Sequence, residues 1–170
     1  MAELKSLLDE VLESWEGVRE GLIAEVENIP ADRFDFRPTP EVRGVRELVQ
    51  HILEVAMMMT GEFTRDDTNL HRASWPKLLA LYAKPAWKAK TKAQLLRLLR
   101  SQLKDGLKRF RDRGELALLQ THKRFDGLQG TKHAWVQHGV AHEEYHRGQL
   151  AVYARMMGLV PALTRMIQGG

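Results

Sequence analysis

The residues best suited to chemistry lie in the stretch HEEYH, which occupies positions 142–146. If this stretch is helical, His142 and His146 are one turn apart and their side chains can bind the same metal ion. The pattern also matches H-E-x-x-H, the zinc motif of metalloproteases, in which the glutamate activates water. Those proteases take their third ligand from downstream of the motif. No His, Asp or Glu follows residue 146 here, so a third ligand must come from upstream and a protease is disfavoured.

Two further histidines belong to the same segment. At 100° per residue, His138, His142 and His146 fall within about 80° of one helix face, whereas His133 falls on the other side. With a rise of ~1.5 Å per residue, His138 and His146 are about 12 Å apart, which is too far for one ion. Chelation therefore requires an adjacent pair, either His138 with His142 or His142 with His146.

His51 lies in the middle of another apolar helical face, beside Leu48, Ile52 and Val55. A single histidine in such a place is more often a core residue with one hydrogen bond. However, two helices that direct histidines into one core would bury several unpaired imidazoles, which is costly in free energy. A shared divalent metal ion would satisfy all of them. Because the chain has no cysteine, its ligands can only be His, Asp or Glu.

A ferritin-like di-iron site is a weaker alternative, since it requires two E-x-x-H pairs and two further glutamates. Glu143 and His146 form one such pair. Glu47 precedes His51 by four residues, which is the wrong spacing for the second.

Four long amphipathic segments must position these residues. The first carries an apolar stripe from Leu4 to Leu22 and ends near Pro30; the others are expected at residues 39–63, 91–114 and 131–158. Thr39, Thr91 and Thr131 are candidate N-caps, and Gly114 and Gly158 are candidate ends. Residues 66–90 and 114–130 are irregular, apart from one short helix expected at 75–82, and they can cover a pocket. With no alternating strand pattern, the sequence predicts an all-α four-helix bundle with long connections, forming a single domain over residues 1–170.

Composition narrows the possible functions. The chain of 170 residues is 44% hydrophobic and 28% charged, and without cysteine it has neither disulfides nor a cysteine nucleophile. Its apolar runs are too short to span a membrane, and its polar N-terminus does not resemble a signal peptide, so a cytoplasmic location is expected. The net charge is +4, with acidic residues concentrated in 1–41 and basic ones in 84–113, and these regions can complement each other.

The segments FRPTPEVRGVRELVQHILE and HGVAHEEYHRGQL resemble the DinB-like superfamily, which includes the damage-inducible DinB proteins and the bacillithiol- and mycothiol-dependent enzymes. The resemblance implies a DinB-like four-helix bundle, often a homodimer, with a zinc or nickel ion on three histidines. The implied ligands are His51, His142 and His146, with His138 as a neighbour in the pocket. Tyr145 stands where many members have another histidine, a departure that leaves the three ligands in place.

The function implied by this resemblance is that of a metal-dependent hydrolase or a thiol S-transferase, acting on a small-molecule substrate and in the second case with a low-molecular-weight thiol as cosubstrate. Glu54 and Glu143 are candidates for bases or ligand-orienting groups, although a solvated surface carboxylate is the favoured interpretation of each. Gln149 and Tyr153 share the metal-facing arc, where they either contact substrate or pack in the core.

Two non-catalytic functions remain as alternatives. A basic stripe on the third segment can follow the phosphates of a nucleic acid, although no recognised nucleic-acid motif supports this; its members are Arg97, Arg100, Lys104, Lys108 and Arg111. Alternatively, in a stress-response protein, a structural metal ion would only tie two helices together.

Overall fold

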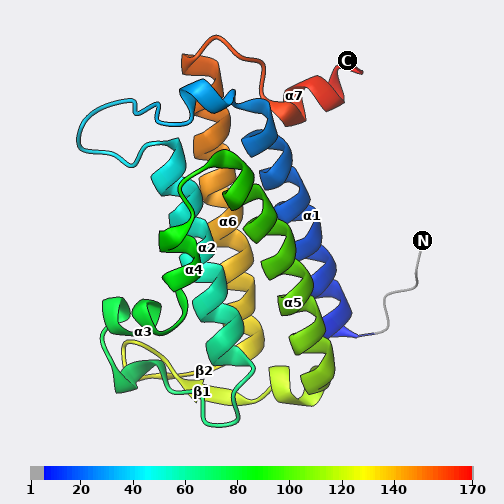
Figure 1. Ribbon diagram of the computed structural model, residues 1–170. Coiled ribbons are helices and arrows are strands. Elements are labelled where there is room, and N and C mark those ends of the chain that lie inside the picture. Colours follow the sequence, from blue (N-terminus) through cyan, green and yellow to red (C-terminus); the bar gives the residue numbers. More distant parts are fainter. Residues whose placement is uncertain (1–5, 170) are drawn as a thin grey trace.

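A computed structural model describes residues 6–169 as a bundle of four long helices (Figure 1). These are α1 (Leu7–Asn28), α2 (Val45–Phe63), α5 (Lys92–Leu118) and α6 (Lys132–Met156). Both α1 and α2 pack against α5 and α6, so α1 lies diagonally opposite α2 and α5 lies diagonally opposite α6. The predicted four-helix bundle is confirmed. Leu4, the first member of the predicted apolar stripe, lies outside the described residues.

Side-chain caps mark where three of the four long helices begin, and glycines with positive φ lie near the ends of two. Thr91 and Thr131 accept hydrogen bonds from the backbone amides three residues later, as predicted, and Gln94 completes the capping box of α5. Gly114 interrupts the helical path of α5 with φ 75°, a value that favours glycine. Gly158 likewise adopts φ 77° just after α6. The predicted end of the fourth segment is therefore confirmed, whereas α5 is kinked at Gly114 and continues to Leu118.

The predicted start of the second helix is wrong. It was expected after Thr39, but α2 begins at Val45, with Gly44 as its N-cap. The amide of Val45 donates instead to the carbonyl of Phe36, which folds residues 36–44 into a turn. Threonine followed by proline is a local signal for a helix start. Here the tertiary backbone contacts override that signal.

Short elements occupy the connections. The predicted helix at 75–82 is confirmed as α3. This helix is Trp75–Tyr82. The others were not anticipated; they are η1 (Ala31–Arg33), η2 (Leu70–Arg72), α4 (Lys84–Lys88), β1 (Thr121–Lys123), β2 (Gln129–Thr131) and α7 (Ala162–Ile167). The two strands pair antiparallel at one end of the bundle, with Thr121 opposite Thr131 (Figure 1). Three residues are too few to show an alternating pattern, so the sequence could not reveal this hairpin.

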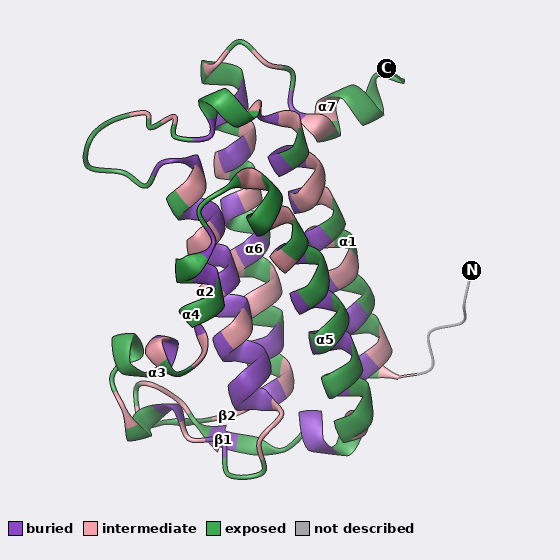
Figure 2. Ribbon diagram, viewed as in Figure 1, coloured by how far each residue is buried: buried purple, intermediate pink, exposed green. Residues whose placement is uncertain are grey.

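Buried residues recur along all four long helices (Figure 2). They form two apolar clusters with a buried polar layer between them. The layer contains Arg19 of α1, Gln102 of α5 and Glu143 of α6, all of them buried. Gln102 also donates to the hydroxyl of Thr60, at 3.0 Å, which brings α2 into the same network. The layer therefore joins all four long helices by hydrogen bonds.

Within residues 6–169, none of the helices has the length and apolar character required to cross a membrane.

Candidate metal centre

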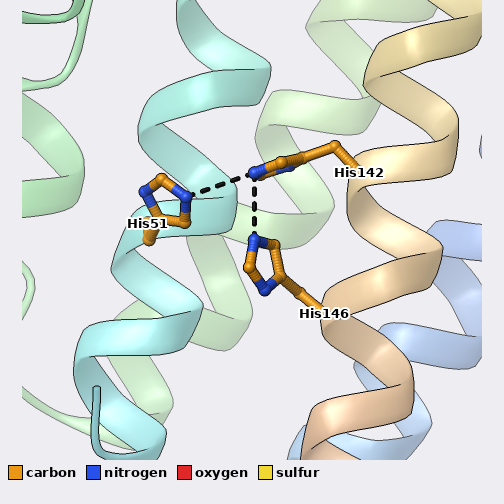
Figure 3. A group of neighbouring side chains, drawn as sticks. All are labelled: His51, His142 and His146. Carbon is orange, nitrogen blue, oxygen red and sulfur yellow. Dashed lines mark hydrogen bonds between the residues drawn. The ribbon is translucent and has the colours of Figure 1, made fainter. Parts of the chain in front are cut away.

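Three histidines from two helices converge in the middle of the bundle. His51 lies on α2, and His142 and His146 lie one turn apart on α6 (Figure 3). The Nε2 atom of His142 is 3.2 Å from Nε2 of His51 and 3.0 Å from Nε2 of His146. All three ligand atoms lie within 4.8 Å of one another. The sequence left two pairs on α6 open, and the pair that joins His51 is His142 with His146.

Neighbouring side chains fix the tautomers of two of these imidazoles. Nδ1 of His51 lies 2.7 Å from a carboxylate oxygen of Glu54, and Nδ1 of His146 lies 2.6 Å from the amide oxygen of Gln149. Both oxygens can only accept, so each Nδ1 carries the proton and each Nε2 presents a lone pair. These lone pairs point toward Nε2 of His142, which can donate one proton at most. Without a cation, at least one of the two lone pairs therefore faces another nitrogen without a proton between them, which is unfavourable. A cation at this point would accept the lone pairs.

Two of the three imidazoles are held in the protonation state that metal binding requires. Burial lowers the pKa of His142 to about 3, and the neighbouring His146 and His51 add to the effect. Burial likewise lowers the pKa of His146. Both rings are therefore neutral at pH 7, and neutral imidazole is the form that binds a metal ion.

The spacing of the nitrogen atoms fits a small divalent ion. Three imidazole nitrogens on a tetrahedral zinc ion, each at 2.0–2.1 Å, lie about 3.3 Å from one another. The separations of 3.0 and 3.2 Å around His142 differ from this by a few tenths of an ångström. The donor set, three nitrogens with no thiolate, suits zinc or nickel.

Glu54 is held inside the site rather than being the solvated surface carboxylate favoured by the sequence. Its second oxygen accepts a hydrogen bond of 2.7 Å from the indole of Trp87, on α4. Burial acts to raise the pKa of Glu54, but the hydrogen bonds from His51 and Trp87 outweigh it and the pKa is lowered. The carboxylate therefore stays ionised and orients His51, as the outer partners of metal-binding histidines commonly do.

Glu143 is neither a pocket residue nor a surface carboxylate, so both predicted places for it are wrong. It is 1% exposed, and its two oxygens accept from Nε and Nη2 of Arg19 at 2.8 and 2.5 Å. The indole of Trp15 donates to it as well, at 2.8 Å. The residue after His142 thus faces α1, and the first glutamate of the HEEYH stretch belongs to the polar layer of the core.

The remaining candidate residues divide between site and scaffold. Gln149 contacts His146, as described above. Tyr153 is buried, and its hydroxyl donates to the carbonyl of Arg43 at 3.0 Å, so it pins the turn before α2. His138 does not reach the cluster, but it lines an apolar cavity to which His142 also contributes. Tyr145 is exposed, and its ring packs against that of His146 with centroids 5.1 Å apart.

The two irregular segments both reach this cavity. Leu70 and Trp75 come from residues 66–90, and Phe125 comes from residues 114–130. The basic stripe on α5, by contrast, is partly neutralised within the molecule. Arg100 pairs with Glu27 of α1, and Lys108 pairs with Asp112.

Sequence reasoning missed the partners that support the cluster. Trp87 belongs to a helix of five residues that carries no clear signal. Arg19 lies among apolar residues of α1. Its complete burial, which requires a partner for its charge, is seen only in the structure. Glu54, three residues after His51, had a usable signal, because i and i+3 side chains are neighbours on a helix.

Comparison with known proteins places the chain among bundles of the same kind. The sequence model of the DinB family matches residues 2–168. YfiT from Bacillus subtilis, described as a probable metal-dependent hydrolase with an unusual four-helix bundle topology, has a TM-score of 0.70 at 19% identity, over 89% of this chain and 88% of YfiT. The DinB-like protein YjoA from Bacillus subtilis has a TM-score of 0.66 at 22% identity, over 88% of this chain and 92% of YjoA. No curated protein matches the sequence significantly. At these identities the solved structures establish a shared fold.

Proposed function

The chain belongs to the DinB family, and we propose that it binds a divalent metal ion on His51, His142 and His146 and uses it in hydrolysis or thiol transfer on a small molecule. The observation that carries this proposal is the orientation of the rings. Glu54 and Gln149 occupy the outward Nδ1 atoms, so the inward Nε2 atoms are left as lone-pair donors around one point.

The donor set favours a catalytic over a structural role. Structural zinc sites are closed by four protein ligands, whereas catalytic sites keep three and leave a position open. Among residues 6–169, the group of ligand atoms consists of these three histidines alone. When bound there, a divalent ion supplies Lewis acidity at its open position. The chain itself positions the three histidines and keeps His142 and His146 neutral.

Hydrolase and S-transferase chemistry differ in the nucleophile, which is water in one case and a low-molecular-weight thiol in the other. The description of YfiT as a probable metal-dependent hydrolase supports the first. Zinc and nickel are the proposed metals, since both bind imidazole well.

Metal analysis of the purified protein tests the proposal. Untagged protein, prepared without nickel resin, should contain about one divalent ion per chain, and His51→Ala and His146→Ala should each lose it. His133→Ala is the matched control, because His133 lies on the same helix but on another face, and this variant should keep the ion. Stoichiometric metal in both ligand variants would exclude the site.

A second measurement separates the two reactions. Metal-loaded protein that releases nitrophenolate from nitrophenyl esters, with the rate lost in His146→Ala, supports the hydrolase. Metal-dependent consumption of a thiol in the presence of an alkyl halide supports the S-transferase. If the metal-loaded and metal-free proteins behave alike in both assays, the ion is structural.

We also propose that the protein is a homodimer. Three exposed apolar residues, Tyr145, Val152 and Met156, lie on one outward face of α6 at spacings of seven and four. Sedimentation should give twice the chain mass, and Val152→Glu should give the monomer. A monomeric wild-type protein contradicts this.

A further inference from the structure

An apolar cavity of about 190 Å³ lies directly beside the histidine cluster. Its walls come from five parts of the fold, one of which is η2 with Leu70. Met58 and Phe63 belong to α2, Trp75 to α3, Phe125 to the loop between the strands and Trp135 to α6. Apart from its two histidines, the lining carries no ionisable side chain. Such a cavity favours an uncharged, apolar occupant, because a charged group would lose its hydration without gaining a partner.

The cavity walls are preorganised by aromatic contacts. Trp75 meets Phe125 edge to face with centroids 5.1 Å apart, and Phe125 meets Trp135 at 5.8 Å. Trp135 in turn packs against His138 at 5.1 Å. Edge-to-face aromatic pairs are favourable beyond the area that they bury. The cavity therefore does not require a ligand to hold its shape.

A buried ion pair fixes the segment that carries Trp75. Glu62, at the end of α2, is fully buried and accepts from Arg72 of η2 at 2.6 and 2.7 Å. The hydroxyl of Tyr82, at the end of α3, donates to the same carboxylate at 2.7 Å. Both ends of the segment that covers the cavity are thus tied to α2.

The position of the cavity relates it to the metal centre. His142 is the one cluster residue that also lines the cavity. Along α2, the lining residues Val55, Met58 and Phe63 follow His51 in the direction of the hairpin. An occupant of the cavity therefore lies against the ring of His142, at the hairpin side of the three histidines.

We infer that this cavity binds the uncharged apolar part of the substrate, a single aromatic ring or a branched alkyl group of similar size, and holds it beside His142. The size follows from the volume, since apolar cavities of roughly 150 Å³ bind benzene. That the occupant is the substrate rests on the proposed function, whereas binding in the cavity does not. The substrate class is thus a small molecule with one apolar group and its reactive bond adjacent to that group.

Binding of 4-fluorotoluene, followed by ¹⁹F NMR line broadening, tests the cavity directly. The first measurement uses metal-free protein at pH 8, so that no bound metal ion influences the result. We expect saturable binding of the neutral probe and at least tenfold weaker binding of 4-fluorobenzoate, its anionic analogue. Absence of saturable binding to folded protein, or equal binding of the two probes, would overturn the inference.

Two variants locate the probe. Trp75→Ala removes one aromatic wall and should weaken binding roughly three- to tenfold, whereas the matched Trp75→Phe should bind nearly as well as wild type. Met58→Trp fills the cavity and should abolish binding. Near-UV circular dichroism verifies that each variant is folded. If Trp75→Ala and Met58→Trp both bind like wild type, the probe lies elsewhere and the inference fails.

Paramagnetic relaxation relates the probe to the metal. With Co²⁺ bound, the ¹⁹F signal of the probe should relax much faster than with Zn²⁺ bound. Equal relaxation, with uptake of both metals verified, would separate the cavity from the centre and overturn its assignment to the substrate. If the protein binds the probe but takes up neither metal, the proposed function fails while the cavity remains a binding site for apolar molecules. If the protein takes up metal but does not bind the probe, the inference about the cavity fails while the proposed metal site stands.

Discussion

Glu143 and Arg19 form a buried ion pair in which the carboxylate accepts two hydrogen bonds from the guanidinium. Arg19 has further partners on α5, since Nη1 donates to the carbonyl of Leu99 and to the amide oxygen of Gln102, both at 2.8 Å. The pair therefore connects α1, α5 and α6. It lies next to His142, whose side chain points to another side of α6. Its hydrogen bonds fix the rotation of α6 about its own axis, and with it the direction of the metal-facing histidines.

We predict that Glu143→Gln destabilises the fold but leaves the metal site in place. A neutral side chain leaves the buried Arg19 without a counter-charge, and breaking one side of a buried ion pair costs roughly 3–5 kcal/mol. Urea unfolding of the metal-free protein measures this loss. The metal content of the folded variant should remain near that of wild type, because Glu143 is not directed at the cluster.

Glu144→Gln provides the matched control for this variant. Glu144 is the next residue on α6, but it is exposed and pairs with Arg147 at the surface. Its replacement should change the free energy of unfolding by less than about 1 kcal/mol. If Glu143→Gln is as stable as Glu144→Gln and loses catalysis, then Glu143 acts in the chemistry and its assignment to the core is wrong.

A second prediction concerns the groups that orient the ligands. Glu54→Ala and Gln149→Ala each free one imidazole to rotate or change tautomer, and loss of such an outer partner typically weakens metal binding 10–100-fold. Competition with a chromogenic chelator measures the affinity for zinc. Both variants should still bind one ion per chain at saturation.

Glu54→Gln separates orientation from charge. Its amide oxygen can still accept from Nδ1 of His51, so affinity should recover most of what Glu54→Ala loses. Unchanged zinc affinity in both alanine variants would show that the histidines need no outer partners. In that case the orientation of the lone pairs would not be the basis of the site.

The helices and the histidine cluster could be predicted because most of their signals are periodic and local. Apolar residues recur at helical spacing along all four long helices, and Thr91 and Thr131 cap the last two of them within their own sequence neighbourhood. The pitch of one helix left two pairs open, His138 with His142 and His142 with His146, and the family resemblance favoured the second. His51 needed a second argument, the cost of burying unpaired imidazoles, since its partner lies 91 residues away.

The remaining features depend on contacts between segments that are distant in sequence. Arg19 and Glu143 are 124 residues apart, and neither residue by itself indicates its partner. The hydrogen bond from Trp87 to Glu54 likewise depends on how α4 folds back onto α2. The start of α2 was misplaced for the same reason, because backbone contacts to Phe34 and Phe36 decide it. Local spacing carries no information on such contacts.

A third prediction addresses the close approach of α2 and α6 between the histidine cluster and the β1–β2 hairpin. A β-carbon added at Gly139 would lie 2.0 Å from the sulfur of Met59, so the glycine permits this approach. Gly139→Ala should therefore destabilise the protein by about 1–3 kcal/mol, as overpacking commonly does. In the alanine background, Met59→Ala should cost clearly less than it does in wild type, because it relieves the clash. Urea unfolding of the four proteins in this cycle gives the coupling, and additive effects would contradict the contact.

The last prediction concerns acid stability and the buried His122 of β1. This side chain is packed against Phe63 and Trp135, with ring centroids 5.3 and 6.0 Å away. Burial, assisted by the positive charge of Lys132, lowers the pKa of His122 below its ordinary value of 6.5. In the unfolded chain His122 takes up a proton near that ordinary value, whereas in the folded protein it does so only at lower pH. The unfolded state therefore binds more protons in this window, and the free energy of unfolding falls as the pH drops below 6.5.

Replacing His122 isolates this contribution. His142 and His146 also have lowered pKa values, but they affect wild type and variant alike. In His122→Leu, the free energy of unfolding of metal-free protein should consequently fall less steeply between pH 6.5 and about 5 than it does in wild type. Urea unfolding at half-unit pH intervals measures both curves. Parallel curves would mean that folding does not change the pKa of His122. A steeper curve for the variant would contradict the argument, because it would require that folding stabilises the charged form of His122.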